Sequence, residues 1–150
     1  MAAETRVGID HEADIVAARQ KGRELAAQAG FPPSDATLIA TAISEVARNI
    51  VIYARRGEVV LDLVHDGRRR GIRIIARDDG PGIPDVELAM RDGYSTGKSL
   101  GLGLPGARRI VDDFEISSEV GRGTIVTMRK WLPRWRPRNH SSSGASPRAR

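Results

Sequence analysis

Two helices are predicted near the start of the chain, the second of them by a clear apolar periodicity. The first follows Asp10, which can cap it, and runs to about Ala29 before Gly30 ends it. The second follows the helix-breaking sequence FPPS, where Ser34 can serve as the cap, and continues to about Ala54. Its apolar positions recur at helical spacing, at Leu38, Ile39, Ala42, Ile43, Val46, Ala47 and Ile50.

Five further segments have the composition and length of strands. The first is TRVGID, near the N-terminus. After the two helices come EVVLDLV and GIRIIAR, and the last two strands are FEISSEV and GTIVTMRKW, joined by the turn GRG. The linker HDGRRRG contains Asp66-Gly67, a hairpin signal, but its length predicts a loop of more than two residues.

The rest of the pattern consists of one loop and two shorter helices. The sequence DDGPGIPD is a turn-rich loop, a short helix is predicted near 85–91, and another helix is predicted over roughly 104–113. Because hairpins join consecutive strands, the sheet must be antiparallel or mixed, with its helices on one face. The fold class predicted is therefore α+β.

Charge separates the predicted domain, residues 1–132, from a tail, residues 133–150. The tail holds five arginines and no acid, which accounts for the net charge of +5 and leaves the domain neutral. Its Pro-, Ser- and Arg-rich composition predicts disorder. A solvated extension is favoured over a weak contact of the tail with RNA, DNA or an acidic partner, in which Trp135 would stack.

The composition also narrows the cellular compartment. The chain has no cysteine, so it has neither a disulfide framework nor a cysteine zinc site, which fits a reducing cytoplasm. No apolar run approaches the length of about 20 residues that a membrane span needs. The start of the chain lacks the apolar core of a signal peptide. A cytoplasmic location is therefore expected.

The stretch DGYSTGKSLGLGLPG contains Gly97-Lys98-Ser99, which looks like the end of a phosphate-binding P-loop. A P-loop has four residues between its first glycine and Gly-Lys-Ser/Thr. Gly93 is one residue too close, and the preceding PDVELAMRD predicts a short helix or loop where a P-loop follows a buried strand. The chain is therefore not a P-loop NTPase.

A first candidate constellation is Glu45-x-x-x-Asn49 on the second helix. The spacing places both side chains on one helix face, at the border of the apolar stripe. A carboxylate there can take a proton from a nucleophile, and an amide oxygen can bind a hard cation such as Mg²⁺. Taken alone, the pair is far more typical of the polar side of an ordinary helix than of a functional site.

A second constellation, Asp78-x-Gly80-x-Gly82, follows the end of an apolar strand. Glycine lets a ligand approach the backbone closely. An aspartate at the strand end can accept a hydrogen bond from an exocyclic amine such as adenine N6. Alone, the motif also fits an acidic turn, and Asp79 is interpreted as such a turn residue.

A third constellation, Gly101-Leu102-Gly103-Leu104, opens the later helix. Backbone N–H groups at a helix start bind phosphate, and glycines allow close approach. The preceding GYSTGKS suits a lid over a triphosphate, and Lys98 can reach the phosphates as a movable charge or remain a solvated loop lysine.

In this order, the three constellations resemble the N, G1 and G2 boxes of the GHKL (Bergerat-fold) ATPase/kinase superfamily. GRGTIVTM adds Thr124, where the superfamily often has a threonine beside adenine. The resemblance covers roughly residues 5–132. Within the superfamily, ATAISEVARNIVIYA, DDGPGIPD and DGYSTGKSLGLGLPGARRIVDDFEI are most similar to the RsbT-like serine/threonine switch kinases and the anti-sigma factor kinases of the RsbW and SpoIIAB type. The tail departs from that pattern, and so does Lys98, where a small neutral residue is expected.

The resemblance implies a two-layer α/β sandwich with a mixed, mainly antiparallel sheet and helices on one face. It also implies ATP and Mg²⁺ as cofactors. Glu45 would be the general base, Asn49 the Mg²⁺ ligand, and Asp78 the group that reads the adenine amine in a pocket shaped by the next glycines. The residues expected to bind the nucleotide are Asn49, Asp78, Gly80, Gly82, Lys98, Gly101, Leu102, Gly103, Leu104 and Thr124.

The same resemblance implies two protein-level functions. The first is a switch kinase that phosphorylates a serine or threonine of a STAS-domain protein, acts in stress signalling by partner switching and engages a downstream phosphatase. The second is an anti-sigma factor that binds a sigma factor and also phosphorylates its antagonist. A binding module that uses ATP only to change shape is a third reading, against which the intact Glu45 counts.

A complete histidine kinase is not expected, because His11, His65 and His140 are scattered and no dimerising helix pair carries one. Gyrase-type and Hsp90-type machines need further domains that this length does not hold.

Overall fold

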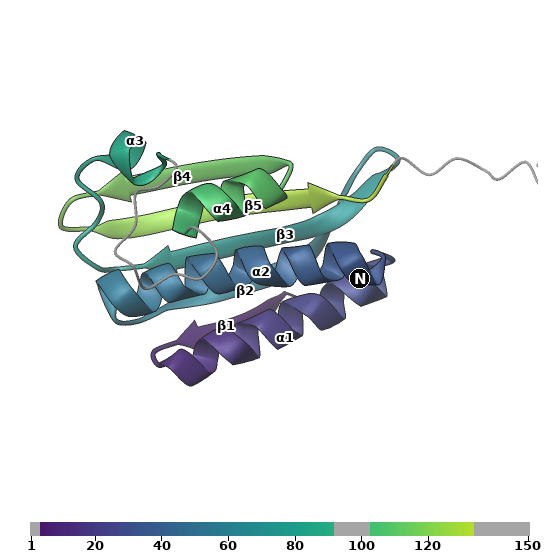
Figure 1. The fold of residues 1–150 in the computed structure, drawn as a ribbon, viewed down its shortest axis with the longest axis horizontal. Coiled ribbons are helices and arrows are strands. Elements are labelled where there is room, and N and C mark those ends of the chain that lie inside the picture. The colour runs from purple at the N-terminus through teal and green to yellow at the C-terminus, as the bar shows by residue number, and fades with distance from the viewer. Residues whose placement is uncertain (1–3, 92–102, 134–150) are drawn as a thin grey trace, which may run out of the picture.

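A computed structural model describes residues 4–91 and 103–133. The chain begins with β1 (Thr5–Ile9), α1 (Glu12–Ala29), α2 (Pro33–Asn49), the π-helical segment η1 (Ile50–Ala54), β2 (Gly57–Asp66) and β3 (Arg69–Asp78). It continues with α3 (Val86–Ala89), α4 (Gly103–Ile110), β4 (Asp113–Glu119) and β5 (Gly123–Trp131). The strands form one sheet in the order β1-β2-β3-β5-β4 (Figure 1).

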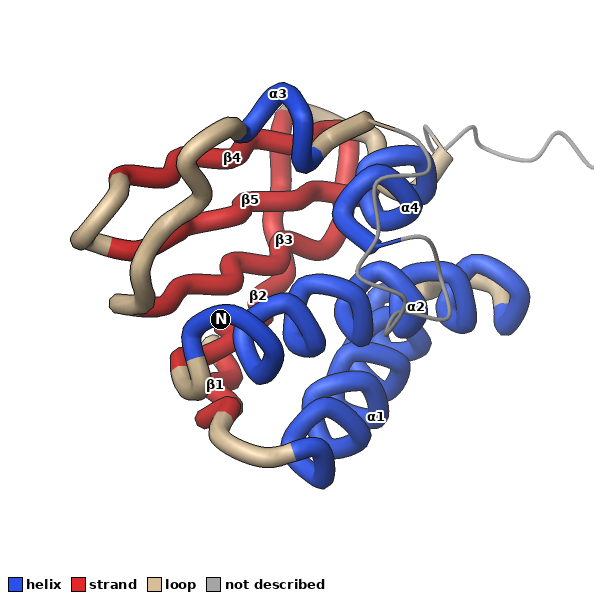
Figure 2. Tube along the Cα trace, turned by 60° about the vertical axis from the view of Figure 1, so that its left-hand side comes forward, coloured by secondary structure: helices blue, strands red, loops and turns tan. Residues whose placement is uncertain are grey.

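The predicted α+β architecture is confirmed. Helices α1, α2 and α4 lie on one face of the sheet, with α2 packed between the other two (Figures 1 and 2). The prediction allowed a mixed sheet, but every described strand pair is antiparallel. Strand β5 lies between β3 and β4 and is antiparallel to both. We call the helix-covered side the inner face and the opposite side the outer face.

The core lies between the inner face and α2. Its largest fully buried side chains come from the helix and from alternate positions of the central strands, and they include Ile39, Ile43, Val46, Ile50, Val59, Leu61, Ile72, Ile74 and Met128. The segment Pro33–Ala54 is long and apolar enough to span a membrane by length and composition, contrary to the expectation from the sequence. Because its apolar side is buried on the sheet, it serves here as a core helix.

The starts of the first two helices differ from the predictions. Asp10 does not cap α1; instead the Asp14 carboxylate reaches back and accepts hydrogen bonds from the N–H groups of Asp10 and His11, at 2.8 and 2.9 Å. Helix α2 begins one residue before Ser34, at Pro33, because proline lacks the N–H that a first helical turn leaves unpaired. Both corrections concern which residue satisfies the first backbone donors.

Two turns also depart from expectation. The β2–β3 connection is a two-residue turn, because Asp66 pairs with Arg69 across the strands, so the longer predicted loop is wrong. Gly67 takes a positive φ of 62° there, which only glycine adopts without strain. The last helix ends at Ile110, earlier than the predicted residue 113, because Asp113 already belongs to β4.

The outer face is held by ion pairs between neighbouring strands. Asp62 and Arg73 lie opposite each other and form two hydrogen bonds, of 2.7 and 3.1 Å. Glu58 accepts from both Arg6, at 3.1 Å, and Arg77, at 2.9 Å. Although Val60 points to this face between the charged residues, it is only 2% exposed. The long charged side chains therefore cover apolar surface as well as pairing with one another.

Candidate active site

The candidate general base lies on α2, which packs between α1 and α4. Glu45 is 4% exposed and is the one buried acidic side chain among the described residues. Asn49 is half-buried, one helical turn further on. Burying a carboxylate is costly unless it is hydrogen-bonded or used in chemistry. Together these positions fit the predicted pair of proton acceptor and metal-binding amide.

Helix α2 changes character directly after Asn49. The next five residues, Ile50–Ala54, form the π-helical segment η1, where the sequence predicted a continuous α-helix. The cause lies in tertiary packing: Ile50 packs against Gly57, and Ala54 packs so closely on Gly80 that a Cβ there would clash with it. Such π segments often occur at functional sites. Here η1 continues the Glu45–Asn49 helix and packs against Gly80, two residues after Asp78.

The second constellation lies at the end of β3. Asp78 pairs with Gly57 of β2 on one side and with Thr124 of β5 on the other, so the Asp78 and Thr124 side chains share the inner face. The Oδ1 atom of Asp78 accepts the N–H of Gly80 at 2.9 Å. Its Oδ2 atom has no hydrogen bond within the described residues, and the side chain is half-buried. One carboxylate oxygen therefore remains to accept an amine such as that of adenine.

A hydroxyl pair supports this end of the sheet, and one of its members was not among the predicted site residues. Ser118 Oγ lies 2.8 Å from Thr124 Oγ1 and accepts the N–H of Ile83 at 2.7 Å. Thr124 is buried, and Ser118 stands opposite it across the β4–β5 hairpin. Counting back from the GRG turn would have identified Ser118 as this partner. The pair fixes the Asp78–Ile83 loop against β5.

Backbone contacts complete the loop. Gly121 N–H donates to the carbonyl of Pro81 at 2.9 Å. A Cβ at Gly82 would run into the carbonyl of Glu119, and Gly82 has a φ of 80°. The glycine is thus required by close approach of two backbones. The predicted role of Gly82 in shaping the adenine pocket stays a prediction.

The third constellation is described only in part. Gly103, with a φ of 69°, opens α4, and Leu104 is buried against the core. Helix α4 packs beside α2, so its N-terminus lies on the same side of the sheet as Glu45. Lys98, Gly101 and Leu102, with the predicted lid, lie outside the described residues.

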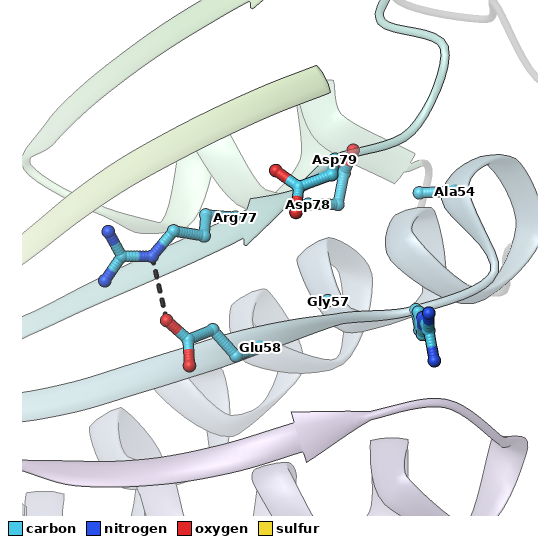
Figure 3. A pocket seen from close by; sticks show the side chains of 7 residues that line it. Ala54, Gly57, Glu58, Arg77, Asp78 and Asp79 are labelled. Atoms are coloured by element: carbon cyan, nitrogen blue, oxygen red, sulfur yellow. Dashed lines mark hydrogen bonds and ion pairs between the residues drawn. The ribbon is translucent and has the colours of Figure 1, made fainter. Parts of the chain in front are cut away.

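A pocket of about 460 Å³ opens beside Asp78, shown in Figure 3. Its lining comes from the ends of β2 and β3 and the segment before β2, and comprises Ala54, Arg56, Gly57, Glu58, Arg77, Asp78 and Asp79. Glu58 and Arg77 belong to the outer face, whereas Glu45 lies on the helix side. This pocket therefore shares Asp78 with the candidate active site but does not contain the candidate base.

The described residues contain no cluster of three or more His, Cys, Asp or Glu side chains that could hold a metal by itself. A Mg²⁺ ion usually keeps several waters and is held by one or two protein ligands plus substrate phosphates. The amide of Asn49, next to the buried carboxylate of Glu45, fits that limited contribution. The residues present therefore suit a magnesium–nucleotide complex better than a metal held by protein alone.

The comparison with protein families defines the class of protein. Over residues 10–130 the chain matches the family described as the histidine kinase-like ATPase domain. The chain belongs to this family, and the predicted GHKL membership is confirmed.

The relatives specify the class further. Over 126 residues the chain is 50% identical to the serine/threonine-protein kinase RsbT of Bacillus subtilis (strain 168), which covers 84% of this chain and 95% of that protein. It is 31% identical over 100 residues to the anti-sigma F factor of Thermoanaerobacter sp. (strain X514), covering 63% of this chain and 68% of that protein. The chain is therefore a protein kinase of the serine/threonine type, as predicted.

A solved structure supports the fold. The mycobacterial sensor histidine kinase MprB superposes with a TM-score of 0.51 at 16% identity, and the match covers 86% of this chain and 97% of that one. At this identity the likeness bears on the fold alone. It confirms the predicted sandwich of helices on one sheet face.

Proposed function

We propose that the chain transfers the γ-phosphoryl group of Mg·ATP to a serine or threonine of a STAS-domain protein. In doing so it would regulate sigma factor signalling by partner switching in the cytoplasm. The observation that carries the proposal is the buried carboxylate of Glu45, one turn from Asn49, in a chain that is 50% identical to a serine/threonine-protein kinase. The division into a domain of residues 1–132 and a tail of residues 133–150 stays a prediction.

In this proposal each residue has a separate task. Glu45 accepts the proton of the substrate hydroxyl as its oxygen bonds to the γ-phosphorus, and the bond from that phosphorus to the bridging oxygen breaks to release ADP. Asn49 holds the Mg²⁺ that neutralises the phosphates. Asp78 Oδ2 accepts the adenine amine beside Thr124, in the pocket shaped by Gly80 and Gly82. Phosphoryl transfer is mostly positioning and charge stabilisation, so the base contributes only part of the rate.

The phosphate end of the proposed site rests on residues of the third constellation. Backbone N–H groups around Gly101, Leu102, Gly103 and Leu104 would hold the phosphates at the start of α4, and Lys98 would approach them as a movable charge. Both assignments come from the motif resemblance, supported by the family match over residues 10–130.

The test is phosphoryl transfer measured by intact mass, with Mg·ATP and purified STAS-domain proteins. A gain of one phosphate on the partner is expected, and Glu45→Ala should slow it by at least about 100-fold, because general-base catalysis typically contributes 10²–10⁴-fold. Glu45→Gln keeps the shape of the buried side chain, and Glu24→Ala removes an exposed acid from α1 as the matched control. ATP binding should persist in all three variants. Transfer by Glu45→Gln at the parent rate would show that Glu45 is not the base.

A second candidate function is that of an anti-sigma factor that binds a sigma factor and also phosphorylates its antagonist. The observation in its favour is the 31% identity to an anti-sigma F factor. Pull-down of purified sigma factors with the ATP-loaded chain separates the two readings. Tight sigma binding would favour the second, and binding of a downstream phosphatase would favour the first.

A further inference from the structure

An exposed surface follows directly after Asn49, on the outward side of η1. We define the η1 patch as Ile52, Tyr53, Arg55 and Arg56. Ile52 is 38% exposed and Tyr53 is 45% exposed, and both arginines are exposed. Large apolar side chains beside unpaired charges on a surface are typical of a protein-binding site.

The local structure fixes this exposure. The inward residues of η1, Ile50 and Ala54, pack against Gly57 and Gly80. Because η1 is anchored on that side, its intervening residues project outward. The wall of the candidate nucleotide site is therefore also the base of the η1 patch.

Backbone strain marks the end of the patch. Arg55 has a φ of 76° and is the one non-glycine residue with positive φ in the described chain. A residue held in that region costs about 1–3 kcal/mol unless it is glycine. Glycine would make this turn at lower cost, so the turn itself does not require the arginine side chain.

The patch carries the positive charge of Arg55 and Arg56, and Arg56 lines the same pocket as the acids Glu58, Asp78 and Asp79. Between Val46 and Gly57 the sequence holds three arginines and no acid, and one of them, Arg48, pairs with Glu12 of α1 at 3.8 Å. Arg55 and Arg56 form no ion pair within the described residues, unlike the outer-face Arg73, whose guanidinium binds Asp62. Uncompensated charge of one sign favours a partner of the opposite sign.

The η1 patch lies close to Glu45 along the helix. Tyr53 is eight residues after Glu45, about 12 Å along the helix axis at about 1.5 Å per residue. A standard interface buries about 800 Å² per partner, which corresponds to a disc of roughly 16 Å radius. Tyr53 therefore lies within the radius of a standard interface centred on Glu45.

We infer that the η1 patch is the docking surface for the STAS-domain substrate protein, which presents apolar and acidic side chains to it. This inference rests on the proposed function. Tyr53 packs in the apolar part of the interface, and Arg55 pairs with an acid of the partner. Both residues determine substrate affinity and take no part in phosphoryl transfer.

The test uses steady-state kinetics of the full chain with a purified STAS-domain protein that the parent enzyme phosphorylates. Tyr53→Ser and Arg55→Gly should each raise KM for that protein at least tenfold, with kcat within threefold and the Kd for ATP within twofold of the parent. Arg55→Gly also relieves the strained φ, so the loss of affinity should accompany an unchanged or higher Tm. Raised salt should increase the KM of the parent for the STAS-domain protein more than that of Arg55→Gly, because salt screens the charge pair that Arg55 forms with the partner.

Matched controls come from elsewhere on the surface. Ile125→Ser changes an apolar residue that is 44% exposed on the outer face, and Arg68→Gly removes an exposed arginine from the β2–β3 turn. Both should keep the parent KM. Parent KM values in Tyr53→Ser and Arg55→Gly, with transfer intact, would overturn the docking inference alone. ATP binding by the parent chain without phosphorylation of any STAS-domain protein would overturn the proposed function, and the docking inference with it.

Discussion

The two faces of the sheet use aspartate differently. On the outer face, Asp62 of β2 gives both carboxylate oxygens to Arg73. On the inner face, Asp78 of the neighbouring strand gives one oxygen to the Gly80 N–H and keeps the other without a hydrogen bond among the described residues. Both oxygens of Asp62 are hydrogen-bonded within the fold, whereas one oxygen of Asp78 can still accept a hydrogen bond from a ligand.

The difference gives a physical criterion for separating structural from functional polar groups. A surface charge that is paired within the fold contributes little to stability, because solvent screens the interaction. A half-buried acceptor with one oxygen left over is costly to keep unless something binds it. Substitutions on each side can test whether the inner-face end of the sheet is a close-fitted site and whether the outer face only supports the fold.

The largest effect is expected at Gly123, which lies against the end of β3. A Cβ there would run into the carbonyl oxygen of Asp78, and the φ of 116° is unfavourable for alanine. Gly123→Ala should lower the free energy of unfolding by about 3 kcal/mol, combining backbone strain with overpacking. Urea unfolding measures the loss, and ATP affinity should fall with it.

Gly121→Ala is the matched control for this prediction. Gly121 also has a positive φ, of 85°, but a Cβ there would meet no atom within 4 Å, so only the strain of about 1 kcal/mol applies. Equal losses in the two variants would mean that the close fit against Asp78 is not what Gly123 provides.

The next largest effect is expected at Asp78. In Asp78→Asn the amide oxygen can still accept the Gly80 N–H, but the NH₂ group replaces the acceptor that adenine requires. ATP affinity should fall about 10- to 100-fold, the range for an unpaired buried donor of about 1–3 kcal/mol. Calorimetric titration with ATP measures it.

The matched control for Asp78→Asn is the same substitution at Asp62 of the neighbouring strand β2, on the outer face. Asp62→Asn should lower the Tm slightly and leave the Kd for ATP unchanged, because among the described residues the Asp62 side chain hydrogen-bonds to Arg73 alone, on the outer face. Loss of ATP affinity in Asp62→Asn, or its retention in Asp78→Asn, would contradict the division of roles between the two faces.

A smaller effect is expected from the Asp62–Arg73 pair itself. The hydrogen bond to Asp62, with its charge, raises the pKa of Arg73. The pair is partly buried and has bidentate geometry, so a double-mutant cycle with Asp62→Ala and Arg73→Ala should give a coupling of about 1 kcal/mol. Coupling indistinguishable from zero would mean that the two losses arise from packing over Val60 and not from the pair.

Local sequence signals were sufficient for much of the fold. The periodicity from Leu38 to Ile50 identified the central helix, and hairpin signals identified the strand order along the chain. Asp78 and Thr124 were both chosen from motifs, and the sheet register places them side by side. These features depend on residues that are close in sequence or on a recognisable motif.

The parts that could not be predicted depend on distant contacts. The π segment η1 follows from the packing of Ile50 on Gly57 and of Ala54 on Gly80, which no periodicity encodes. The role of Ser118 was missed, although the register of the last hairpin, counted from the GRG turn, places it opposite Thr124. The use of Asp14 in place of Asp10 at the start of α1 is a local contact that was missed, since the Asp14 carboxylate accepts from N–H groups three and four residues earlier.

The smallest effect is expected at Asp14, a third carboxylate that the fold uses. The N–H groups of His11 and then Asp10 lower the pKa of Asp14 in the folded chain. A folded pKa below the unfolded value means that this stabilisation is present above the unfolded pKa, about 3.9, and is lost as pH falls through the folded value. Asp14→Ala should therefore be less stable than the parent at pH 6, and the difference should shrink as pH falls from about 5 to 3. Urea unfolding across that range, with Asp10→Ala as the control that keeps the backbone donor, measures it. A stability difference between Asp14→Ala and the parent that stays constant with pH would show that Asp14 stabilises the fold through packing and not as a charged hydrogen-bond acceptor.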